Sequence, residues 1–215
     1  MSELRQSTAA RLNELLAAGD LGLLDDATAV RFADYCALLL RWNTRTNLTA
    51  VRDEEGILSR HFVESIACAR ALPPGITTLL DYGSGAGFPG LPIALCRPEI
   101  AVTLAESQNK KAAFLLEAVR MLGGKVKVYH GRAESISPRF DCVTLRAVDR
   151  MPQAIESAAR LITSTGWLVV MTTEGEWKDL QRASGAAFVW NEPVQLPGSE
   201  RRLLVLGQRQ ASLGA

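Results

Sequence analysis

Residues 79–90 read Leu79-Leu80-Asp81-Tyr82-Gly83-Ser84-Gly85-Ala86-Gly87-Phe88-Pro89-Gly90, and they decide the fold. A short apolar strand, residues 77–81, runs directly into a glycine-rich turn, and the apolar residues 91–95 are typical of an opening helix. Glycine is needed in such a turn because it adopts positive φ and lets the backbone approach a ligand closely. The first N–H groups of the helix attract anionic groups. A strand, glycine loop and helix at the carboxyl edge of a parallel sheet predict a nucleoside-cofactor site.

An acidic residue ends the next predicted strand. This strand, residues 101–106, finishes with Glu106, 25 positions after Asp81. Because the carboxyl ends of neighbouring parallel strands lie side by side, Glu106 is predicted to accept hydrogen bonds from both ribose hydroxyls. The alternative is a solvated acid at a strand end. A third strand, residues 125–129, leads into residues 130–134, which are predicted to contact an adenine ring.

Two cofactor classes fit this pattern, the nicotinamide dinucleotides and S-adenosylmethionine. The dinucleotide fingerprint spaces its glycines G-x-G-x-x-G, whereas this loop reads Gly83-x-Gly85-x-Gly87 and has no second glycine-rich half. The last two predicted strands, residues 187–196 and 201–208, are joined by a hairpin-like turn. An antiparallel hairpin that closes a parallel sheet resembles the class I methyltransferase fold. S-adenosylmethionine is therefore the predicted cofactor.

The chain is predicted to divide into a helical extension, residues 1–74, and a Rossmann-like α/β body, residues 75–215. In the extension, helices are predicted over residues 2–18, 27–42 and 53–72. In the body, strands are predicted near residues 77–82, 101–106, 125–129, 141–146, 167–172, 187–196 and 201–208, and helices near 90–96, 108–122, 152–163 and 176–184. This alternation predicts a mostly parallel seven-stranded sheet with an antiparallel last strand and helices on both faces.

Composition limits the other possible classes of function. The 215 residues are 47% hydrophobic, which is enough for a sizeable core. A net charge of +1 gives no global field for polyanions, so RNA binding would need a local basic patch. The four cysteines form no CxxC pair, and with two histidines no metal site is predicted. We expect a cytoplasmic monomer with reduced core thiols, because neither a signal peptide nor an apolar run of membrane-spanning length is evident.

The residues around the fourth strand narrow the class of methyl acceptor. The strand ends in Arg146-Ala147-Val148, where enzymes that methylate exocyclic amines carry an Asn- or Asp-Pro-Pro-Tyr box. Cys142 lies at the opposite end of the strand from the place where a pyrimidine-methylating nucleophile is needed. No His–Asp pair is evident as a base for a hydroxyl acceptor. His61 is expected to pack or cap within the third helix, and His130 is equally compatible with a solvated position.

Guanine N7 is an acceptor that needs no base, because it has an in-plane lone pair and no proton. An enzyme acting on it need only align the reacting atoms and stabilise the shift of charge. Basic side chains nearby would hold phosphates or hydrogen-bond guanine O6, although surface charge is their alternative role. The candidates at the carboxyl edge of the sheet are Lys110, Lys111, Arg132, Arg146 and Arg150.

Three segments carry a resemblance to a known family. They are Trp42-Asn43-x-x-x-Asn47-Leu48-Thr49-Ala50-Val51-Arg52, Arg60-His61-Phe62-x-x-Ser65-Ile66, and Asp81-x-Gly83-Ser84-Gly85-x-Gly87-Phe88-Pro89-Gly90-x-Pro92. Together with Lys110, Arg132-Ala133-Glu134 and Arg146-Ala147, they resemble the ribosomal RNA small subunit methyltransferase G family over residues 35–205. This family methylates N7 of a guanine in 16S rRNA with S-adenosylmethionine, so the resemblance implies the same activity and a 16S rRNA partner.

The resemblance also implies roles for individual residues. The residues expected to line the cofactor are Gly83, Phe88, Ala133, Glu134 and Arg146, together with Gly85 and Glu106 from the glycine loop and the second strand. Lys110 and Arg132 are expected near the active site or the RNA. Two positions depart from the family pattern: Tyr82 replaces a usually aliphatic residue, and Glu106 stands where many relatives carry Asp. Neither change is expected to remove activity.

Two other functions are compatible with the fold. A small-molecule methyltransferase would need a lidded apolar pocket, of which the loop with Asn47 and Arg52 gives no sign. A non-catalytic RNA-binding module would not need an intact glycine loop with Glu106, and it would usually be more basic than +1. Binding of radiolabelled S-adenosylmethionine distinguishes an enzyme from such a module.

Overall fold

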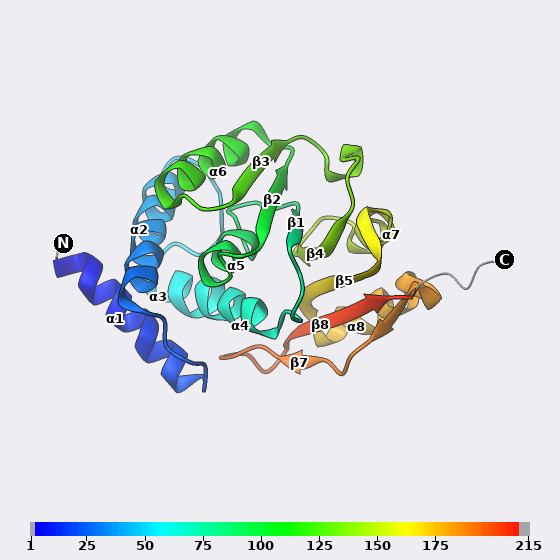
Figure 1. Cartoon of the computed structure of the whole chain (residues 1–215). Coiled ribbons are helices and arrows are strands. Elements are labelled where there is room, and N and C mark those ends of the chain that lie inside the picture. Colours follow the sequence, from blue (N-terminus) through cyan, green and yellow to red (C-terminus); the bar gives the residue numbers. More distant parts are fainter. Residues whose placement is uncertain (1–2, 211–215) are drawn as a thin grey trace.

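A mixed β-sheet forms the centre of the structure, a computed structural model that describes residues 3–210 (Figure 1). Its strand order is β3-β2-β1-β4-β5-β8-β6, and β7 pairs with β8 beside this row. The strands are β1 (Thr78–Tyr82), β2 (Ala101–Glu106), β3 (Val126–His130), β4 (Phe140–Arg146), β5 (Ile162–Thr173), β6 (Phe188–Trp190), β7 (Val194–Gln195) and β8 (Arg202–Arg209). The first five strands are parallel to one another, as the βα alternation predicted.

The register brings the carboxyl ends of four strands to one edge of the sheet. Tyr82 at the end of β1 pairs with Ala105 of β2 and with Leu145 of β4. Glu106 at the end of β2 pairs with His130 at the end of β3. The acid that was predicted to lie beside the glycine loop is therefore at this edge, next to the end of β1.

The end of the chain forms the antiparallel border of the sheet. β8 runs antiparallel to β5, as predicted, but the single strand predicted over residues 187–196 is wrong, because it is broken into β6 and β7. Trp190 pairs with Gly207 and Val194 pairs with Leu204, so the β6–β7 side has one extra residue and forms a bulge. Pro193 lies in this interruption and has no N–H to donate to a ladder. The sheet consequently has eight strands rather than seven.

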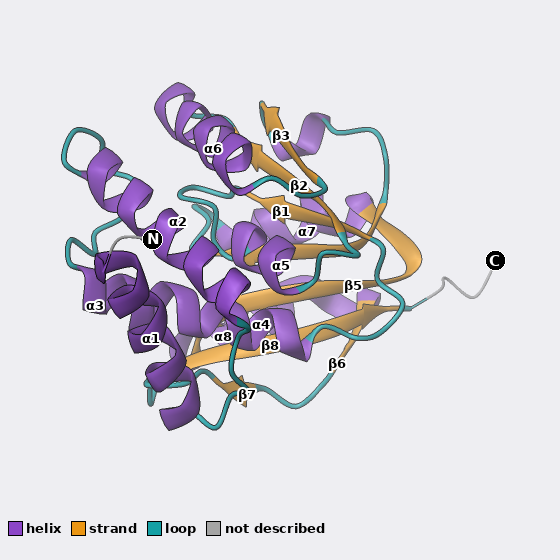
Figure 2. Ribbon diagram, turned by 60° about the vertical axis from the view of Figure 1, so that its left-hand side comes forward, coloured by secondary structure: helices purple, strands orange, loops and turns teal. Residues whose placement is uncertain are grey.

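Helices cover both faces of the sheet (Figure 2). The helices are α1 (Glu3–Ala18), α2 (Asp26–Asn43), α3 (Glu54–Gly56), α4 (Val63–Ala71), α5 (Gly90–Cys96), α6 (Asn109–Leu122), α7 (Met151–Leu161) and α8 (Glu174–Ser184), with short 3-10 turns at Ala133–Ser135 and Gly185–Ala187. α5 and α6 lie against β2 and β3, and the N-terminal helices α2 and α4 pack on them. α7 and α8 lie against β4 and β5. Ser2, the predicted start of the first helix, lies outside the described residues.

The third predicted helix, residues 53–72, is not one regular α-helix. Asp53 caps its first turn by accepting the N–H of Gly56 at 2.8 Å, in agreement with the expected acidic start. The segment Ile57–Phe62 then forms a π-helix before α4 begins. A π-turn widens the helix and is common at functional positions. Here it carries Arg60 and His61, and His61 faces the glycine loop.

Each face of the sheet has its own hydrophobic core. Leu79 belongs to the core shared with the N-terminal helices, which includes Leu12 and Phe32. Leu80, the next residue, belongs to the core under α7 and α8, because successive side chains of a strand point to opposite faces. The extension therefore shares a core with the body. Its boundary near residue 74 stays a prediction.

Candidate active site

The glycine loop between β1 and α5 follows a path that requires glycine. Gly83, Gly85 and Gly87 have φ values of +71°, +59° and +91°, which side chains with a Cβ rarely adopt. The backbone N–H of Ser84 donates to the carbonyl oxygen of Ala105 at 2.9 Å, which ties the loop to β2. These contacts hold the loop across the carboxyl edge of the sheet, as the sequence predicted.

Asp81 at the end of β1 forms hydrogen bonds with both ends of this loop. Its buried carboxylate accepts hydrogen bonds from the Ser84 hydroxyl, from the N–H of Gly90 at 3.1 Å and from the Thr144 hydroxyl at 2.8 Å. Burial raises the pKa of Asp81 above its usual range, although these donors oppose the shift. The sequence placed Asp81 at the strand end but gave it no role. The structure shows that it supports the loop.

Glu106 supports the loop from the neighbouring strand. Its Oε2 accepts the N–H of Gly85 at 2.9 Å, and its Oε1 accepts the N–H of Gln108 at 2.7 Å. The side chain is almost fully buried, so the solvated role weighed above does not describe it. Each carboxylate oxygen can accept more than one hydrogen bond, so both oxygens retain capacity for a ligand.

A cavity of about 350 Å³ opens directly beside Glu106 and the loop. Its walls come from the ends of β1 and β2, the start of α6, and the turns that follow β3 and β4. The residues that line it are Tyr82, Gly83, Ala105, Glu106, Ser107, Gln108, Lys111, Gly131, Arg132, Ala133, Glu134, Ala147, Val148 and Asp149. Five predicted site residues are among them: Gly83, Glu106, Arg132, Ala133 and Glu134.

Three predicted residues that are absent from these walls lie close to them. Gly85 does not line the cavity, but its backbone N–H donates to Glu106, which does. Lys110 is exposed at the start of α6, and the next residue, Lys111, is the lysine that lines the cavity. Arg150 is exposed and its φ is +55°, just before α7. Whether Lys110, Lys111 or Arg150 contacts the RNA or the target guanine stays a prediction.

Tyr82 lines the cavity, although the sequence indicated only that it departs from the family pattern and predicted no role for it. Its hydroxyl donates to Oε1 of Glu134 at 2.5 Å, and burial followed by this carboxylate raises the pKa of Tyr82. The contact connects β1 with the 3-10 turn Ala133–Ser135 across the cavity. Tyr82 therefore orients Glu134, which a shorter aliphatic side chain could not do.

Phe88 and Arg146, both predicted to line the cofactor, lie behind the loop against the N-terminal helices. The ring of Phe88 stacks on His61 at 4.7 Å between ring centres, and the Arg146 guanidinium lies 5.7 Å from the Phe88 ring centre. Arg146 donates to Oε2 of the buried Glu64 at 2.9 Å and to the Ser65 hydroxyl at 3.2 Å. In this geometry both side chains support the glycine loop rather than forming the wall of the cavity.

The two histidines have different environments. Nδ1 of His61 accepts from Arg146 at 3.0 Å, so Nε2 carries the proton and donates to the Thr49 hydroxyl at 2.7 Å. Burial, followed by the nearby arginines, lowers the pKa of His61 to about 3, which keeps it neutral at physiological pH. His130 is exposed at the end of β3 and contacts Oδ1 of Asn109 at 2.9 Å.

The family model for rRNA small subunit methyltransferase G matches residues 29–203. The chain belongs to this family. A ribosomal RNA small subunit methyltransferase G from Roseiflexus sp. (strain RS-1) is 40% identical over 196 residues, covering 85% of this chain and 84% of the relative. Proteins of the same name from Stenotrophomonas maltophilia and Xanthomonas euvesicatoria are 42% and 39% identical and cover 80% and 85% of this chain, respectively, and 81% and 88% of the relatives. The predicted family and enzyme class are confirmed.

Solved structures confirm the fold class of this member of the methyltransferase G family. A SAM-dependent methyltransferase from Aquifex aeolicus superposes with a TM-score of 0.58 at 17% identity, covering 72% of this chain and 93% of the other. A Pyrococcus horikoshii protein solved in complex with MeSAdo gives a TM-score of 0.57 at 16% identity, over 70% and 63% of the two chains. At these identities the likeness shows the class I methyltransferase fold alone.

The cavity of the methyltransferase G fold fits S-adenosylmethionine, the cofactor of the family. A Cβ on Gly83 would come within 3.3 Å of Val148, which also lines the cavity, so glycine at this position keeps the space between them open to a ligand. Carboxylates line the other side, where ribose hydroxyls and an exocyclic amine would find acceptors. Its size is typical of small-molecule sites. The predicted cofactor is therefore consistent with the residues present.

The described part of the chain shows neither a metal site nor a membrane-spanning helix. Within residues 3–210, no group of three or more His, Cys, Asp or Glu side chains is arranged to hold a metal ion. None of the helices in this range combines the length and hydropathy needed to cross a bilayer. The four cysteines are free thiols and three of them are buried, as expected for core residues.

Proposed function

We propose that this protein transfers the methyl group of S-adenosylmethionine to N7 of one guanine in 16S rRNA. The observation that carries the proposal is the glycine loop, held by Asp81 and Glu106 and opening on a cavity, in a chain of the rRNA small subunit methyltransferase G family. The loop supplies the close backbone approach that a nucleoside cofactor needs. Family membership supplies the class of RNA.

In the proposed complex, different residues of the cavity contact different parts of the cofactor. Glu106 accepts the ribose hydroxyls with the lone pairs that Gly85 and Gln108 leave free. The backbone around Gly83 and Gly85 receives the methionine part, and Ala133 with Glu134 receives the adenine. Bound in this way, the cofactor supplies a methyl group on a positively charged sulfur atom.

Phe88 and Arg146 remain predicted cofactor residues, and the proposal assigns them an indirect action. Both contact the N-terminal helices on one side and the glycine loop on the other. Movement of either side chain would shift the loop, and with it the backbone groups around Gly83. Their contribution to cofactor binding is therefore preorganisation of the loop.

The chemistry that the residues support needs alignment and charge stabilisation without proton removal. The walls of the cavity, as described, include carboxylates and basic groups but no histidine. Arg132 in the wall of the cavity and Lys110 at the start of α6 are the groups proposed to lie near the guanine or its phosphates. A guanine N7 attacks in line with its own lone pair, so positioning accounts for the catalytic task.

Mapping of the methylated nucleotide tests the proposed function. The purified protein and methyl-labelled S-adenosylmethionine would be incubated with one of two substrates in parallel reactions. One substrate is 16S rRNA transcribed in vitro, and the other is small ribosomal subunits from a strain lacking the enzyme. Chemical cleavage at N7-methylguanine, read by primer extension, should give one new stop in at least one substrate. Label on an amine, a ribose hydroxyl or a small molecule, and none at N7, would contradict the proposal.

The assembly state and cellular place follow as part of the proposal. We propose a monomer that works in the cytoplasm, where small-subunit rRNA is assembled and modified. A sedimentation experiment at micromolar concentration measures the first, and the fraction of the protein that co-purifies with small-subunit particles measures the second.

A further inference from the structure

An apolar groove lies between α2 and α6, outside the cofactor cavity. Its larger part, about 610 Å³, is lined by Trp42, Ala113, Leu116, Glu117, Arg120 and Met121. A second hollow of about 300 Å³ continues it over the end of α2 and is lined by Arg41, Trp42, Arg45, Thr46 and Glu117. Because Trp42 and Glu117 belong to both, we treat the two as one groove and call it the α2–α6 groove.

The helical period of α6 explains why this groove is exposed. Ala112, Phe114, Leu115, Ala118 and Leu122 are buried against the protein, whereas Ala113, Leu116, Arg120 and Met121 are exposed on the outward side of the same helix. Leu116 and Met121 on the outward side are 52% and 44% exposed. Large apolar side chains exposed together on one helix indicate an interaction site.

Trp42 forms a rigid floor for the groove. Its indole N–H donates to Oε2 of Glu117 at 2.8 Å, and its ring contacts Phe114 edge-on with 5.8 Å between ring centres. The other oxygen of Glu117 forms a salt bridge with Arg41 at 2.5 Å. The only acidic side chain that lines the groove is thus already neutralised within the protein.

The two segments that contribute the groove are more basic than the rest of the chain. Residues 41–52 and 109–122 contain six of the 24 Lys and Arg residues and one of the 23 Asp and Glu residues. These two segments therefore carry a formal charge of +5, while the rest of the chain carries −4. Among the residues that the structure describes, Arg45, Lys110 and Arg120 form no salt bridge.

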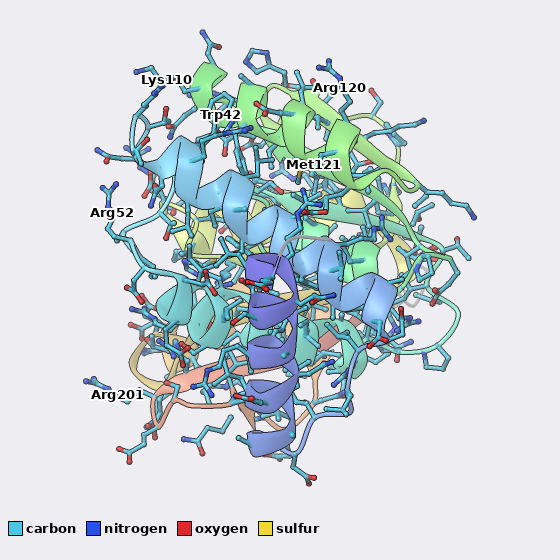
Figure 3. All side chains as sticks on the ribbon, turned by 90° about the vertical axis from the view of Figure 1, so that its left-hand side faces the viewer. Trp42, Arg52, Lys110, Arg120, Met121 and Arg201 are labelled. Atoms are coloured by element: carbon cyan, nitrogen blue, oxygen red, sulfur yellow. The ribbon has the colours of Figure 1, made fainter. Side chains whose placement is uncertain are left out.

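The same helix connects the groove with the cofactor cavity. Lys111 in the first turn of α6 lines the cavity, and Met121 near its other end lines the groove. At 1.5 Å per residue, Lys110 and Arg120 are separated by about 15 Å along the helix. Figure 3 shows Trp42, Arg120 and Met121 on one face of the molecule, with Lys110 toward the other end of α6.

We propose that the α2–α6 groove is a docking surface for RNA, with phosphates on Arg45, Arg120 and Lys110 and an unpaired base in the apolar floor. This inference rests on the proposed function, because it assigns to the rRNA substrate a contact outside the methyl-transfer site. Basic side chains around an apolar and aromatic floor are the combination that single-stranded RNA recognition uses.

Charge decides between RNA and the other possible occupants. A second copy of this chain would bring the same basic face, with Arg41, Arg45 and Arg120 against the single Glu117, onto itself at a symmetric interface, which is repulsive. A hydrophobic protein segment would use Leu116 and Met121 but would leave the surrounding arginines without partners. A polyanion with exposed bases satisfies both features of the surface.

The first test removes charge. Arg45→Gln/Arg120→Gln would be compared with a matched control, Arg160→Gln/Lys178→Gln on α7 and α8, whose side chains are exposed on the other face of the sheet. Affinity for 16S rRNA and for small subunits would be measured at several KCl concentrations. We expect the groove variant to bind about tenfold more weakly, with a salt slope smaller by about 1.5. The control should match the wild type.

The second test changes the apolar floor. Leu116→Ser/Met121→Ser should weaken RNA binding about three- to tenfold without changing the salt slope, since stacking carries no counterion release. Trp42 is left in place because it packs against Phe114 in the folded core. Both variants should keep the wild-type thermal transition within a few degrees and the wild-type affinity for S-adenosylmethionine.

The outcomes separate this inference from the proposed function. If the wild type methylates rRNA and both groove variants keep its RNA affinity and KM for RNA, the docking surface is wrong while the function stands. A change of sedimentation without a change of RNA affinity would make the groove a protein interface and would also overturn the inference. If the wild type methylates no rRNA, the proposed function fails, and loss of RNA binding in the groove variants alone would still support the surface.

Discussion

Oε2 of Glu106 lies 2.9 Å from the backbone nitrogen of Gly85, and this hydrogen bond joins the end of β2 to the loop that follows β1. The other oxygen of the same carboxylate accepts from Gln108 at the entrance to α6. One buried side chain thus connects the glycine loop with the helix on the opposite side of the cavity. A residue predicted to contact ribose thus also shapes the cavity in which that contact is proposed.

Glu106→Gln should weaken S-adenosylmethionine binding more than the loss of one ligand contact would. The amide can accept from only one of the two N–H groups, and its own NH₂ would face the other donor. We expect the Kd from calorimetry to rise by about 10- to 100-fold, consistent with the loss of hydrogen bonds to a charged acceptor. Glu174→Gln, an exposed change on α8, is the control. Wild-type affinity in Glu106→Gln would show that this carboxylate does not serve the cofactor.

Gly83→Asp should abolish measurable cofactor binding while the protein stays folded. The residue has φ of +71°, and its Cβ would come within 3.3 Å of Val148, so a carboxylate there would enter the cavity mouth and repel the methionine carboxylate. Gly123→Asp is a matched control, because its φ is +66° but no atom lies within 4 Å of the added Cβ. Both variants therefore carry the strain of a side chain at positive φ. Tight binding by Gly83→Asp would remove the loop from the cofactor site.

The parts of this site that the sequence predicted correctly are those set by local structure. The glycine loop needs only a strand, three glycines and a helix in succession, and Glu106 is fixed by register because parallel strands end at the same edge. Both features can be recognised in the sequence without knowing how the N-terminal helices pack. Period and turn chemistry were therefore enough for the class of fold and for the position of the cavity.

The parts that the sequence could not supply depend on packing between distant segments. Phe88 follows the loop in sequence, but its ring direction is set by His61 and Tyr35 from the extension. Arg146 lies at a strand end like Glu106, yet Glu64 draws its guanidinium away from the cavity. The break in the strand over residues 187–196 depends on the one-residue shift in pairing with β8 between Trp190 and Val194. None of these contacts leaves a periodic signal.

Arg132→Ala should reduce methylation much more than cofactor affinity. Arg132 is exposed and lines the cavity next to Ala133 and Glu134, and the proposed function assigns it to the RNA or the target guanine. We expect single-turnover rates to fall by at least tenfold while the Kd for S-adenosylmethionine changes less than threefold. Arg139→Ala, which changes an exposed arginine between the 3-10 turn Ala133–Ser135 and β4, provides the control. Equal losses in cofactor affinity and rate would instead identify Arg132 as a cofactor residue.

His61 should make the folded state more sensitive to acid. Burial and the neighbouring arginines Arg146, Arg60 and Arg202 lower its pKa from 6.5 to about 3, so the unfolded chain binds a proton below pH 6.5 that the folded chain does not. Stability from this group is therefore present above pH 6.5 and falls as the pH drops toward 3. Between pH 7.5 and 5.5 the linked loss is about 1.4 kcal/mol.

Urea unfolding of the wild type and of His61→Gln at these two pH values measures this linkage. The variant should be less stable at pH 7.5, because it loses contacts with Thr49 and Arg146, but it should lose about 1.4 kcal/mol less on acidification. His130→Gln, which changes an exposed histidine, should keep the wild-type pH dependence. Identical pH dependence in the wild type and His61→Gln would mean that folding does not lower the pKa of this ring.

The absence of a proton on guanine N7 predicts a flat pH profile for the chemical step. No side chain has to lose a proton, so the single-turnover rate should be nearly constant from about pH 6.5 to 8.5, a range in which an unperturbed histidine largely completes its titration. His61 is hydrogen-bonded at both ring nitrogens and stacked on Phe88, so it is not free to act as a base. Saturating RNA and cofactor should restore most of the rate in His61→Ala and His130→Ala. Single-turnover conditions are required because product release can hide the chemistry. A rate that rises tenfold per pH unit and disappears with either histidine would indicate a base, and hence a hydroxyl or amine acceptor in place of N7.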